Sequence, residues 1–336
     1  MFGADAGGMD QRTLGSSGLT VSAIELGCMG LSQGYGPVDD EESIRLIRHA
    51  LDLGVSMLDT AMSYGAGHNE QLISRALAGR RRDRVQLASK IGIVRDTDGV
   101  RLDGRPEKVA GYCEATLTRL GVEVIDLYYL HRVDPAVPIA DTIGAMSELV
   151  TAGKVRHLGV SEMTAAQLAQ AVAVHPIAAV QFEWSLLWRE AEDDLVPTAR
   201  RLDVGLVPYS PLGRGLLTAI LTTDKIDDSE FRRTDARFHG QNLTINTALV
   251  QALRQLATEL DYTPAQLALA WLLAQSPDVV PIPGTRHIER LSENAAAVDN
   301  PLNPVQLQRL GEVLPHSSWA GDRHSFAVPT TTRTQP

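Results

Sequence analysis

Four polar side chains with complementary chemistry each follow a short apolar segment of this 336-residue chain. They are the carboxylate of Asp59, the phenol of Tyr64, the ammonium of Lys90 and the imidazole of His131. Apolar segments of this kind are typical of buried β-strands. In a parallel α/β barrel, catalytic residues lie at the C-terminal ends of the strands. The sequence therefore predicts one catalytic site built from these four residues.

These residue types suit the reduction of a carbonyl group. The reaction adds a hydride to carbon and a proton to oxygen, and the proton donor must lie within hydrogen-bond reach of that oxygen. A free tyrosine has a pKa of about 10, and a neighbouring cation lowers that pKa. We therefore expect Tyr64 to be the general acid and Lys90 to lower its pKa. Asp59 would hold Lys90 in place, and His131 would hydrogen-bond the carbonyl.

Taken singly, each of the four residues has a structural alternative. Asp59 could cap a helix, and Tyr64 could be a half-buried loop aromatic. Lys90 could form a structural ion pair, and His131 could be a buried histidine with its hydrogen bonds satisfied. The chain has only four lysines, so a lysine directly after an apolar strand is unusual as a surface residue. The joint occurrence of the four types favours the catalytic interpretation.

Composition and charge narrow the possible partners. The net charge of −10 disfavours nonspecific binding to nucleic acid. No run of 18 apolar residues is present, and Met1–Met9 lacks the features of a signal peptide. We expect a cytoplasmic protein with a small-molecule substrate and no nucleic-acid or membrane partner. The nine histidines do not cluster, so no metal site is predicted, and Cys28 and Cys113 are expected to be buried free thiols.

Strand-like and helix-like segments alternate along the chain, which is typical of a parallel sheet with crossover helices. The predicted strands are Ile24–Cys28, Ser56–Asp59, Val85–Lys90, Ile125–His131, Val155–Val160, Ala178–Glu183, Gly205–Tyr209 and Val279–Ile282. The predicted helices are Asp39–Leu53, Asn69–Leu77, Pro106–Leu120, Ile139–Thr151, Thr164–Val174, Glu190–Leu202, Ile245–Leu260, Pro264–Gln275 and Ile288–Ala297. Eight strands with helices between them predict a (β/α)8 TIM barrel, an α/β fold.

Three segments lie outside this alternation. Arg12–Val21, with glycines at its turn, predicts a small hairpin that closes the N-terminal mouth of the barrel. The long connection Ser210–Leu243 follows the seventh strand, where long ordered loops are usually lids or binding loops. We expect the C-terminal tail to lie over the active site. Residues 1–336 are predicted to form a single domain, with 1–10 and 325–336 mobile.

Several nucleotide and hydrolase signatures are absent. The glycine-rich segments Gly34–Gly36 and Gly65–Gly67 do not complete G-x-G-x-x-G, and Gly153-Lys154 is not part of a P-loop. H-E-x-x-H and G-x-S-x-G are also missing. The absence of these motifs disfavours four classes of protein, namely Rossmann oxidoreductases, P-loop NTPases, zinc metalloproteases and α/β-hydrolases.

Further motifs resemble those of the aldo-keto reductases, over nearly the whole chain. They are Asp59-Thr60-Ala61 with Tyr64-Gly65, Asn69-Glu70, Ser89-Lys90, Leu127-Tyr128-Tyr129-Leu130-His131, Gly153-Lys154-Val155-Arg156, Gly159-Val160-Ser161, Gln181-Phe182-Glu183-Trp184-Ser185, Tyr209-Ser210-Pro211-Leu212-Gly213-Arg214-Gly215 and Pro281-Ile282-Pro283-Gly284-Thr285-Arg286. The pattern is most similar to a bacterial and fungal branch with Gly-Val-Ser-Glu and Pro-Gly-Thr-Arg signatures.

The resemblance implies a barrel that binds NADP(H) without a Rossmann domain, with Asp59, Tyr64, Lys90 and His131 as a catalytic tetrad. It implies nicotinamide contacts from Ser161, Gln181 and Tyr209, ribose contacts from Met29 and Gly30, pyrophosphate contacts from Ser210, Leu212, Gly213, Arg214 and Gly215, and adenosine 2′-phosphate contacts from Gly284, Thr285, Arg286, Arg290, Glu293 and Asn294.

Two positions depart from the family's pattern. Position 162 is Glu, where much of the family has Asn beside the nicotinamide carboxamide, and this puts part of that contact in doubt. Position 284 is Gly, where some branches carry a lysine for the 2′-phosphate. Arg286 and Arg290 would then supply the positive charge, and a guanidinium suits a phosphate well.

The substrate would lie above Tyr64. Candidate wall residues by their place after strand ends or on the long loops are Met29, Met62, Ile93, Arg132, Trp188, Phe238 and Trp319, each of which could equally be ordinary packing. The mixture is mostly apolar, which favours an uncharged aldehyde or ketone.

The sequence thus predicts NADPH-dependent reduction of a carbonyl to an alcohol. One alternative is an NADPH-binding sensor or accessory subunit with negligible turnover. Another is a different barrel enzyme, such as an epimerase or lyase, that uses the same four residues. The natural substrate, the physiological direction and the oligomeric state stay open.

Overall fold

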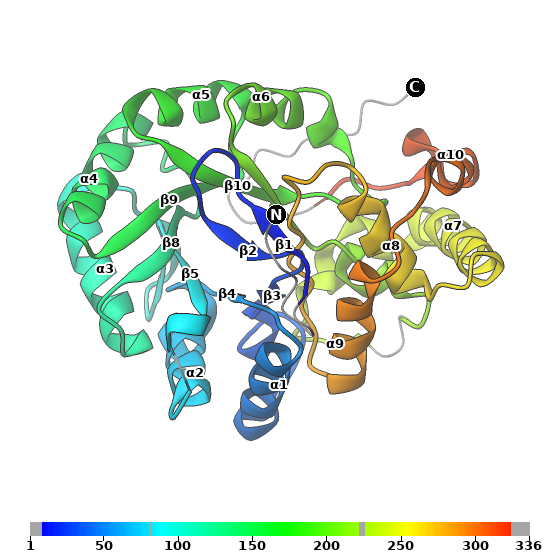
Figure 1. The fold of residues 1–336 in the computed structure, drawn as a ribbon, viewed down its shortest axis with the longest axis horizontal. Helices are drawn as coiled ribbons and strands as arrows, with labels where there is room; N and C mark the ends of the chain where they lie inside the picture. The colour runs from blue at the N-terminus through cyan, green and yellow to red at the C-terminus, as the bar shows by residue number, and fades with distance from the viewer. Residues whose placement is uncertain (1–8, 81, 222–225, 324–336) are drawn as a thin grey trace, which may run out of the picture.

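Seven parallel strands form one sheet in the computed structural model, which describes residues 9–80, 82–221 and 226–323 (Figure 1). Of the residues expected to be mobile, 1–8 and 325–336 lie outside this description. The strands are β3 (Leu26–Gly27), β4 (Met57–Asp59), β5 (Gln86–Ile91), β8 (Ile125–Leu130), β9 (Val155–Ser161), β10 (Ile177–Glu183) and β11 (Gly205–Tyr209), and they are neighbours in this order. Such a sequential parallel order is what an α/β barrel requires.

The segment predicted as the eighth strand, Val279–Ile282, closes the ring. On one side, the Val280 N–H donates to the carbonyl of Leu206 in β11 at 2.8 Å. On the other side, the Gly27 N–H of β3 donates to the carbonyl of Pro283 at 3.1 Å. The predicted α/β barrel is therefore confirmed, with seven regular strands in the described part of the chain. In place of the predicted eighth strand, 279–283 is an extended stretch with a single β-bridge, from Val279 to Leu206.

Helices surround the barrel, as Figure 1 shows. Each of the nine predicted helices has a counterpart, although α6 begins five residues after its predicted start and α7 five residues before. They are α1 (Asp40–Asp52), α2 (His68–Leu77), α3 (Pro106–Leu120), α4 (Ile139–Thr151), α5 (Ala165–Val174), α6 (Leu195–Arg201), α7 (Gly240–Glu259), α8 (Pro264–Leu273) and α9 (Ile288–Ala295). The Asp39 carboxylate accepts from the Glu42 N–H at 2.9 Å and starts α1, while Thr164 and Gln167 form a capping box at α5.

Three elements differ from the prediction. The stretch 190–202, expected as one helix, is a short 3₁₀ turn (Glu190–Glu192) followed by α6. A further helix, α10 (Pro304–Val313), was not predicted, although Asn303 and Gln306 form a capping box that marks its start. A hairpin of β6 (Ile93–Asp96) and β7 (Gly99–Leu102) was also missed. Its signal is Asp98-Gly99 between β-branched residues, which is typical of a tight hairpin turn.

The N-terminal hairpin, β1 (Gln11–Thr13) with β2 (Thr20–Ser22), crosses the N-terminal end of the barrel (Figure 1). Leu14 and Val21 are fully buried and belong to the same apolar cluster as Met57 and Leu127 from inside the barrel. The Arg12 guanidinium donates to the backbone carbonyl of Val279 at 2.7 Å. The hairpin therefore plugs the barrel floor, as predicted.

Side chains inside the barrel fall into an apolar layer and a polar layer. Because successive side chains on a strand alternate in direction, Met57 and Asp59 both point inward from β4. In the same way, Ala88 and Lys90 point inward from β5. The apolar layer lies toward the hairpin, and the polar layer lies at the C-terminal ends of the strands. The fold thus places the predicted tetrad at one end of a closed, apolar interior.

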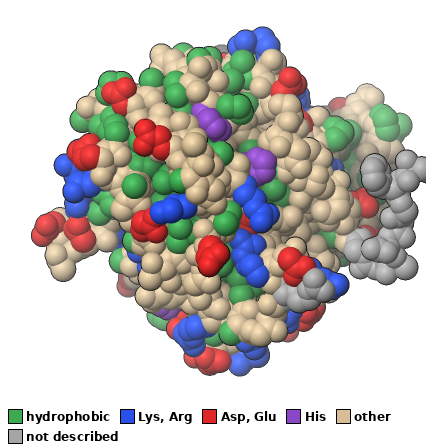
Figure 2. Space-filling view, turned by 60° about the vertical axis from the view of Figure 1, so that its left-hand side comes forward, with side chains coloured by type: hydrophobic (Ala, Val, Ile, Leu, Met, Phe, Trp, Pro, Cys, Tyr) green, Lys and Arg blue, Asp and Glu red, His purple; other side chains and the backbone are tan. Residues whose placement is uncertain are grey.

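The surface has no continuous apolar region on the face that Figure 2 shows, where acidic and basic side chains are interspersed with small hydrophobic areas. Exposed large hydrophobic residues in the described chain are few and scattered, for example Val174, Ile220 and Val305. No helix among the described residues is long and apolar enough to cross a membrane.

We call the place where β3 lies against 279–284 the barrel seam. The two backbones approach each other so closely there that Gly27 and Gly284 have no room for a side chain. A Cβ atom on Gly27 would lie 2.7 Å from the carbonyl oxygen of Ile282, and one on Gly284 would lie 2.8 Å from the carbonyl oxygen of Gly27. We expect Gly27→Ala to lower the free energy of unfolding by about 2 kcal/mol, measured by chemical denaturation.

A matched control is Gly111→Ala, on the exposed face of α3, where a new Cβ meets nothing within 4 Å. There, alanine should be neutral or stabilising, by up to about 1 kcal/mol. Equal unfolding free energies for the two variants would contradict the steric account of the seam.

Candidate active site

Lys90 is the centre of the predicted site. Its side chain is fully buried on β5, and its ammonium donates to a carboxylate oxygen of Asp59, to the Thr60 carbonyl at 2.8 Å and to the Tyr64 hydroxyl at 3.3 Å. An ammonium has three protons to donate, so all three are used. The structure therefore brings three of the four tetrad residues into direct contact.

Charge states within this group follow from burial and from the ion pair. Burial alone would lower the pKa of Lys90, but the Asp59 carboxylate and the Tyr64 hydroxyl together raise it above its usual value. Burial raises the pKa of Tyr64, and Lys90 opposes that rise without cancelling it. The prediction that Lys90 brings the pKa of Tyr64 below its usual value is therefore wrong for this structure. Tyr64 is a neutral phenol whose oxygen accepts from Lys90.

His131 completes the tetrad from the end of β8. Its ring meets the Tyr64 ring edge-on, with centroids 5.8 Å apart. Its Nδ1 is buried and has no hydrogen-bond partner among the described residues. Burial, Arg132 and Lys90 all lower the pKa of His131 well below its usual range, so the imidazole is neutral and can act as a hydrogen-bond donor.

Asp59 also connects the tetrad to the opposite side of the barrel. Its second carboxylate oxygen accepts from the Gln181 side-chain amide on β10 at 2.8 Å. The resemblance implied a nicotinamide contact for Gln181, and this bond to Asp59 was not expected. It gives Asp59 a partner for each oxygen, so the carboxylate is fixed in orientation.

The Asn69-Glu70 motif at the start of α2 supports the site from outside the barrel. The Thr60 hydroxyl donates to the Asn69 side chain at 2.6 Å, and the Ser89 hydroxyl donates to Glu70 at 2.6 Å. Arg119 of α3 pairs with the other oxygen of Glu70. These bonds hold the segments on either side of Tyr64, a positioning role that reading the sequence did not assign.

The remaining residues implied for the nicotinamide lie at the ends of β9 and β11. The Ser161 hydroxyl, at the end of β9, accepts from Arg132 at 3.2 Å. The Tyr209 hydroxyl, at the end of β11, accepts from Arg323 of the C-terminal segment at 3.2 Å. The tail therefore reaches the site, as predicted, and Arg323 is a site residue that sequence reasoning missed.

The loop after β11 has an unusual backbone that suits an anion. Positive φ angles occur at Ser210 (49°), Gly213 (56°), Arg214 (57°) and Gly215 (94°). Conformations of this kind can turn successive N–H groups toward one anion. The Arg214 side chain, however, is buried and pairs with Asp235 at 2.8 Å. It is therefore engaged inside the protein, and Leu212 beside it packs on the core.

The residues implied for the adenosine end lie just before α9 and along it. Arg290 is exposed, Asn294 is buried, and Arg286 donates to the Pro37 carbonyl at 3.0 Å. Burial, Arg290 and Arg286 lower the pKa of His287, while Glu289 and Glu42 oppose this, so basic and acidic groups share this surface. Thr285 accepts from the His287 N–H at 3.2 Å, and Glu293 is partly buried on the helix.

The seam explains why residue 284 is glycine. A Cβ there would meet the Gly27 carbonyl, so the lysine of other branches would not fit without a backbone shift. Met29 and Gly30, implied for the ribose, lie in the 3₁₀ turn Met29–Leu31 directly after β3, and both are partly buried.

Several candidate wall residues for the substrate are core residues. Phe238 and Trp319 are 2% and 3% exposed and belong to the main apolar cluster. Trp188 is equally buried, and the guanidinium groups of Arg237 and Arg323 lie over its ring at 5.9 and 5.6 Å. These aromatics therefore stabilise the loops, rather than presenting free faces to a substrate.

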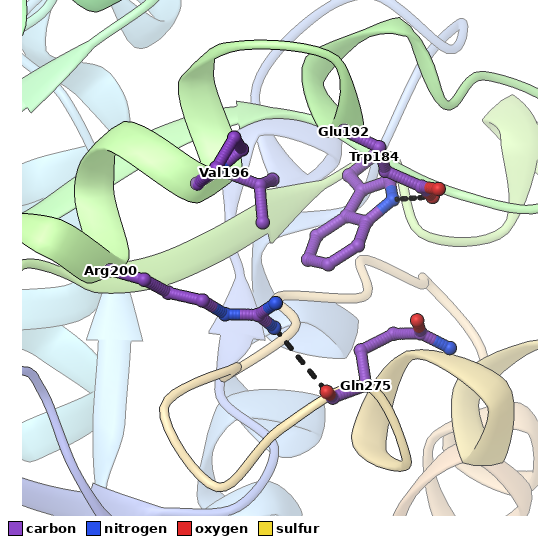
Figure 3. A pocket seen from close by; sticks show the side chains of 6 residues that line it. Trp184, Glu192, Val196, Arg200 and Gln275 are labelled. Carbon is purple, nitrogen blue, oxygen red and sulfur yellow. Dashed lines mark hydrogen bonds between the residues drawn. The ribbon is translucent and has the colours of Figure 1, made fainter.

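Both cysteines, Cys28 and Cys113, are buried free thiols, as predicted. No group of three or more His, Cys, Asp or Glu side chains within the described ranges could hold a metal ion. A hollow of about 470 Å³ lies between Trp184, α6 and the end of α8 (Figure 3). None of the residues lining it belongs to the predicted site, so it lies apart from the tetrad.

Comparisons with known proteins point to one family. The model of the Aldo/keto reductase family matches residues 23–315. A probable aldo-keto reductase 1 from Glycine max is 42% identical over 313 residues, which are 93% of this chain and 90% of that protein.

Solved structures give the same result. A glycerol dehydrogenase from Gluconobacter oxydans has a TM-score of 0.85 and 28% identity, covering 95% of this chain and 99% of its own. An aldo-keto reductase from Bacillus halodurans has a TM-score of 0.78 and 28% identity, covering 96% and 100%. The chain therefore belongs to the Aldo/keto reductase family, whose members are oxidoreductases that act on the carbonyl/alcohol couple with NAD(P)H.

Proposed function

We propose that this protein is an NADPH-dependent carbonyl reductase, which converts an aldehyde or ketone to an alcohol with Tyr64 as the general acid. The observation that carries the proposal is the hydrogen bond from Lys90 Nζ to Tyr64 Oη, at 3.3 Å. Because the ammonium donates to the phenol oxygen, the phenol proton is left to point at another acceptor. A substrate carbonyl oxygen is such an acceptor.

Residues of this protein would donate the proton and stabilise the charge that is left behind. NADPH, when bound, would supply the hydride to the carbonyl carbon. Tyr64 gives its proton to the carbonyl oxygen as negative charge develops there. The raised pKa of Tyr64 is compatible with this step, because an alkoxide is a far stronger base than a phenolate. Lys90 stabilises the phenolate that remains, and neutral His131 donates a hydrogen bond to the same oxygen.

The cofactor would be held by four groups of residues around the strand ends. Ser161, Gln181 and Tyr209 would bind the nicotinamide, and Met29 and Gly30 the ribose. Backbone N–H groups of 210–215 would bind the pyrophosphate. Arg286 and Arg290, with Gly284, Thr285, Glu293 and Asn294, would bind the adenosine 2′-phosphate end. The clustered basic groups at α9 support NADPH over NADH, because a guanidinium pairs strongly with a phosphate.

The proposed substrate is an uncharged carbonyl compound, and residues 1–336 are proposed to form a single domain. The similar glycerol dehydrogenase is named for the oxidation of an alcohol, which is the same chemistry in the reverse direction. A cofactor-binding sensor with negligible turnover remains the second candidate, and turnover distinguishes the two.

The first test follows NADPH oxidation with a panel of aldehydes, ketones and quinones. We expect turnover by the natural sequence, a residual rate with Tyr64→Phe, and a fall in kcat of about 10²- to 10⁴-fold with Lys90→Met. Lys90→Met leaves Tyr64 without the cation that stabilises its phenolate.

Lys108→Met, at an exposed position of α3, is the matched control and should keep normal activity. If no substrate gives turnover above the Tyr64→Phe rate, the sensor function is favoured. Normal kcat in Lys90→Met would refute its role.

The cofactor preference makes a second prediction. Arg290→Ala should weaken NADPH binding by at least about tenfold, because a charge-assisted contact to phosphate is lost, and should leave NADH binding nearly unchanged. Fluorescence titration with both cofactors measures this. Arg309→Ala, exposed on α10, serves as the control, and an equal loss for both cofactors would rule out the 2′-phosphate assignment.

The charge states predict the pH profile of reduction. Reduction needs Tyr64 protonated, and its raised pKa keeps it so to strongly alkaline pH. It also needs His131 neutral, and a lowered pKa moves its protonation to acidic pH. We expect kcat at saturating substrates to be flat from about pH 6 to 9. A transition near pH 6.5 that His131→Gln abolishes would contradict the charge state given to His131.

A further inference from the structure

Glu162, the residue that departs from the family's pattern, has a strained backbone. Its φ angle is +53°, a conformation that costs free energy for a residue other than glycine and persists only when its surroundings fix it. Two bonds tie it to β10: its N–H donates to the Gln181 carbonyl at 2.9 Å, and its carboxylate accepts from the Glu183 N–H at 3.1 Å. The side chain is 2% exposed.

Arg323 of the C-terminal segment is the partner of this carboxylate. Its two terminal nitrogens donate to the two oxygens of Glu162 at 2.7 and 2.5 Å. One of these nitrogens also donates to the Tyr209 hydroxyl. Burial alone would raise the pKa of Glu162, but Arg323, together with Arg132 and the Tyr209 hydroxyl, lowers it. The result is a buried, two-pronged ion pair between residues far apart in the sequence.

The C-terminal segment is anchored so that it delivers Arg323 to this place. The backbone of Ala320 exchanges two hydrogen bonds with the Asn246 side chain of α7, at 2.8 and 2.9 Å. Gly321 turns the chain with φ +85°, and a Cβ there would lie 3.1 Å from the backbone of Arg237. The segment therefore has little freedom to shift.

The charges around the pair are balanced. Arg237 pairs with Glu183 at 2.5 Å, and Arg323 lies 3.8 Å from the other oxygen of Glu183. Burial alone would raise the pKa of Glu183, but Arg237, Arg214 and Arg323 lower it to about 2. Among the described residues, the ion pair of Glu162 is with Arg323, while Arg132 acts on its carboxylate electrostatically. Loss of the paired cation would leave a buried charge without its partner, which is costly.

All three residues proposed for the nicotinamide are joined to this pair. Ser161 immediately precedes Glu162 in the chain, Gln181 accepts from its N–H, and Tyr209 accepts from Arg323. We propose that the Glu162–Arg323 pair positions these three residues, so that the C-terminal segment controls how tightly and how productively the nicotinamide ring is held. This inference rests on the proposed function.

The test compares whole cofactor with a fragment that lacks the nicotinamide. Arg323→Gln removes the charge, and Arg323→Lys keeps it while losing the two-pronged geometry. We expect about a tenfold loss of NADPH affinity for Arg323→Gln, an equal factor for NADH, a smaller loss for Arg323→Lys and a lower kcat. Affinity for 2′,5′-ADP should not change, since that fragment occupies only the adenosine end.

A double variant tests the coupling. Glu162→Gln combined with Arg323→Gln should bind NADPH no more weakly than Arg323→Gln alone, because the two residues act as one unit. Arg309→Gln is the surface control. If the folded variants lose NADPH and 2′,5′-ADP affinity equally, or lose neither, the positioning role is refuted. If the natural sequence binds neither NADPH nor NADH, the proposed function itself fails.

Discussion

The candidate site depends on the ion pair and the hydrogen bonds of the buried Lys90 ammonium. A charged group with no exposure to water is stable only when its protons are bonded and a counter-charge is near. Asp59, Thr60 and Tyr64 meet that requirement together. The same bonds that make the lysine tolerable inside the protein also fix the phenol oxygen beside it. The bonds that stabilise the buried lysine are therefore the same bonds that position Tyr64 for the proposed proton transfer.

This geometry depends on a closed barrel, whose interior between the site and the N-terminal hairpin is filled with apolar side chains. The seam brings β3 against 279–283 so closely that Gly27 and Gly284 have no room for a side chain. The N-terminal hairpin fills the floor with Leu14 and Val21. With water excluded from that side, charge interactions in the polar layer are stronger than at a surface. Loss of water around the two side chains is the first cause of both the raised pKa of Tyr64 and the lowered pKa of His131.

The opposite side of the site is organised by longer-range pairs. Glu162 follows β9 and Glu183 ends the neighbouring β10, whereas Arg237 comes from the long loop and Arg323 from the C-terminal segment. These ion pairs and the packing of both guanidinium groups on Trp188 fix the two segments here, and the bonds of Asn246 to Ala320 add to them in the C-terminal segment. The loop and the tail thus share one electrostatic anchor beside the proposed nicotinamide site.

The sequence by itself determined the barrel and the plug hairpin, and it predicted the four tetrad residues, because strand periodicity and the residues after each strand are local properties. The β6–β7 hairpin and α10 also had local signals, in Asp98-Gly99 and in the capping box of Asn303. Only the tertiary structure decided which way the pKa of Tyr64 moves, since burial opposes Lys90 there. It alone paired Gln181 with Asp59, turned Arg214 inward and joined Arg323 to Glu162. These outcomes depend on distances between segments remote in sequence and on the loss of water around them, and neither quantity is present in a local pattern.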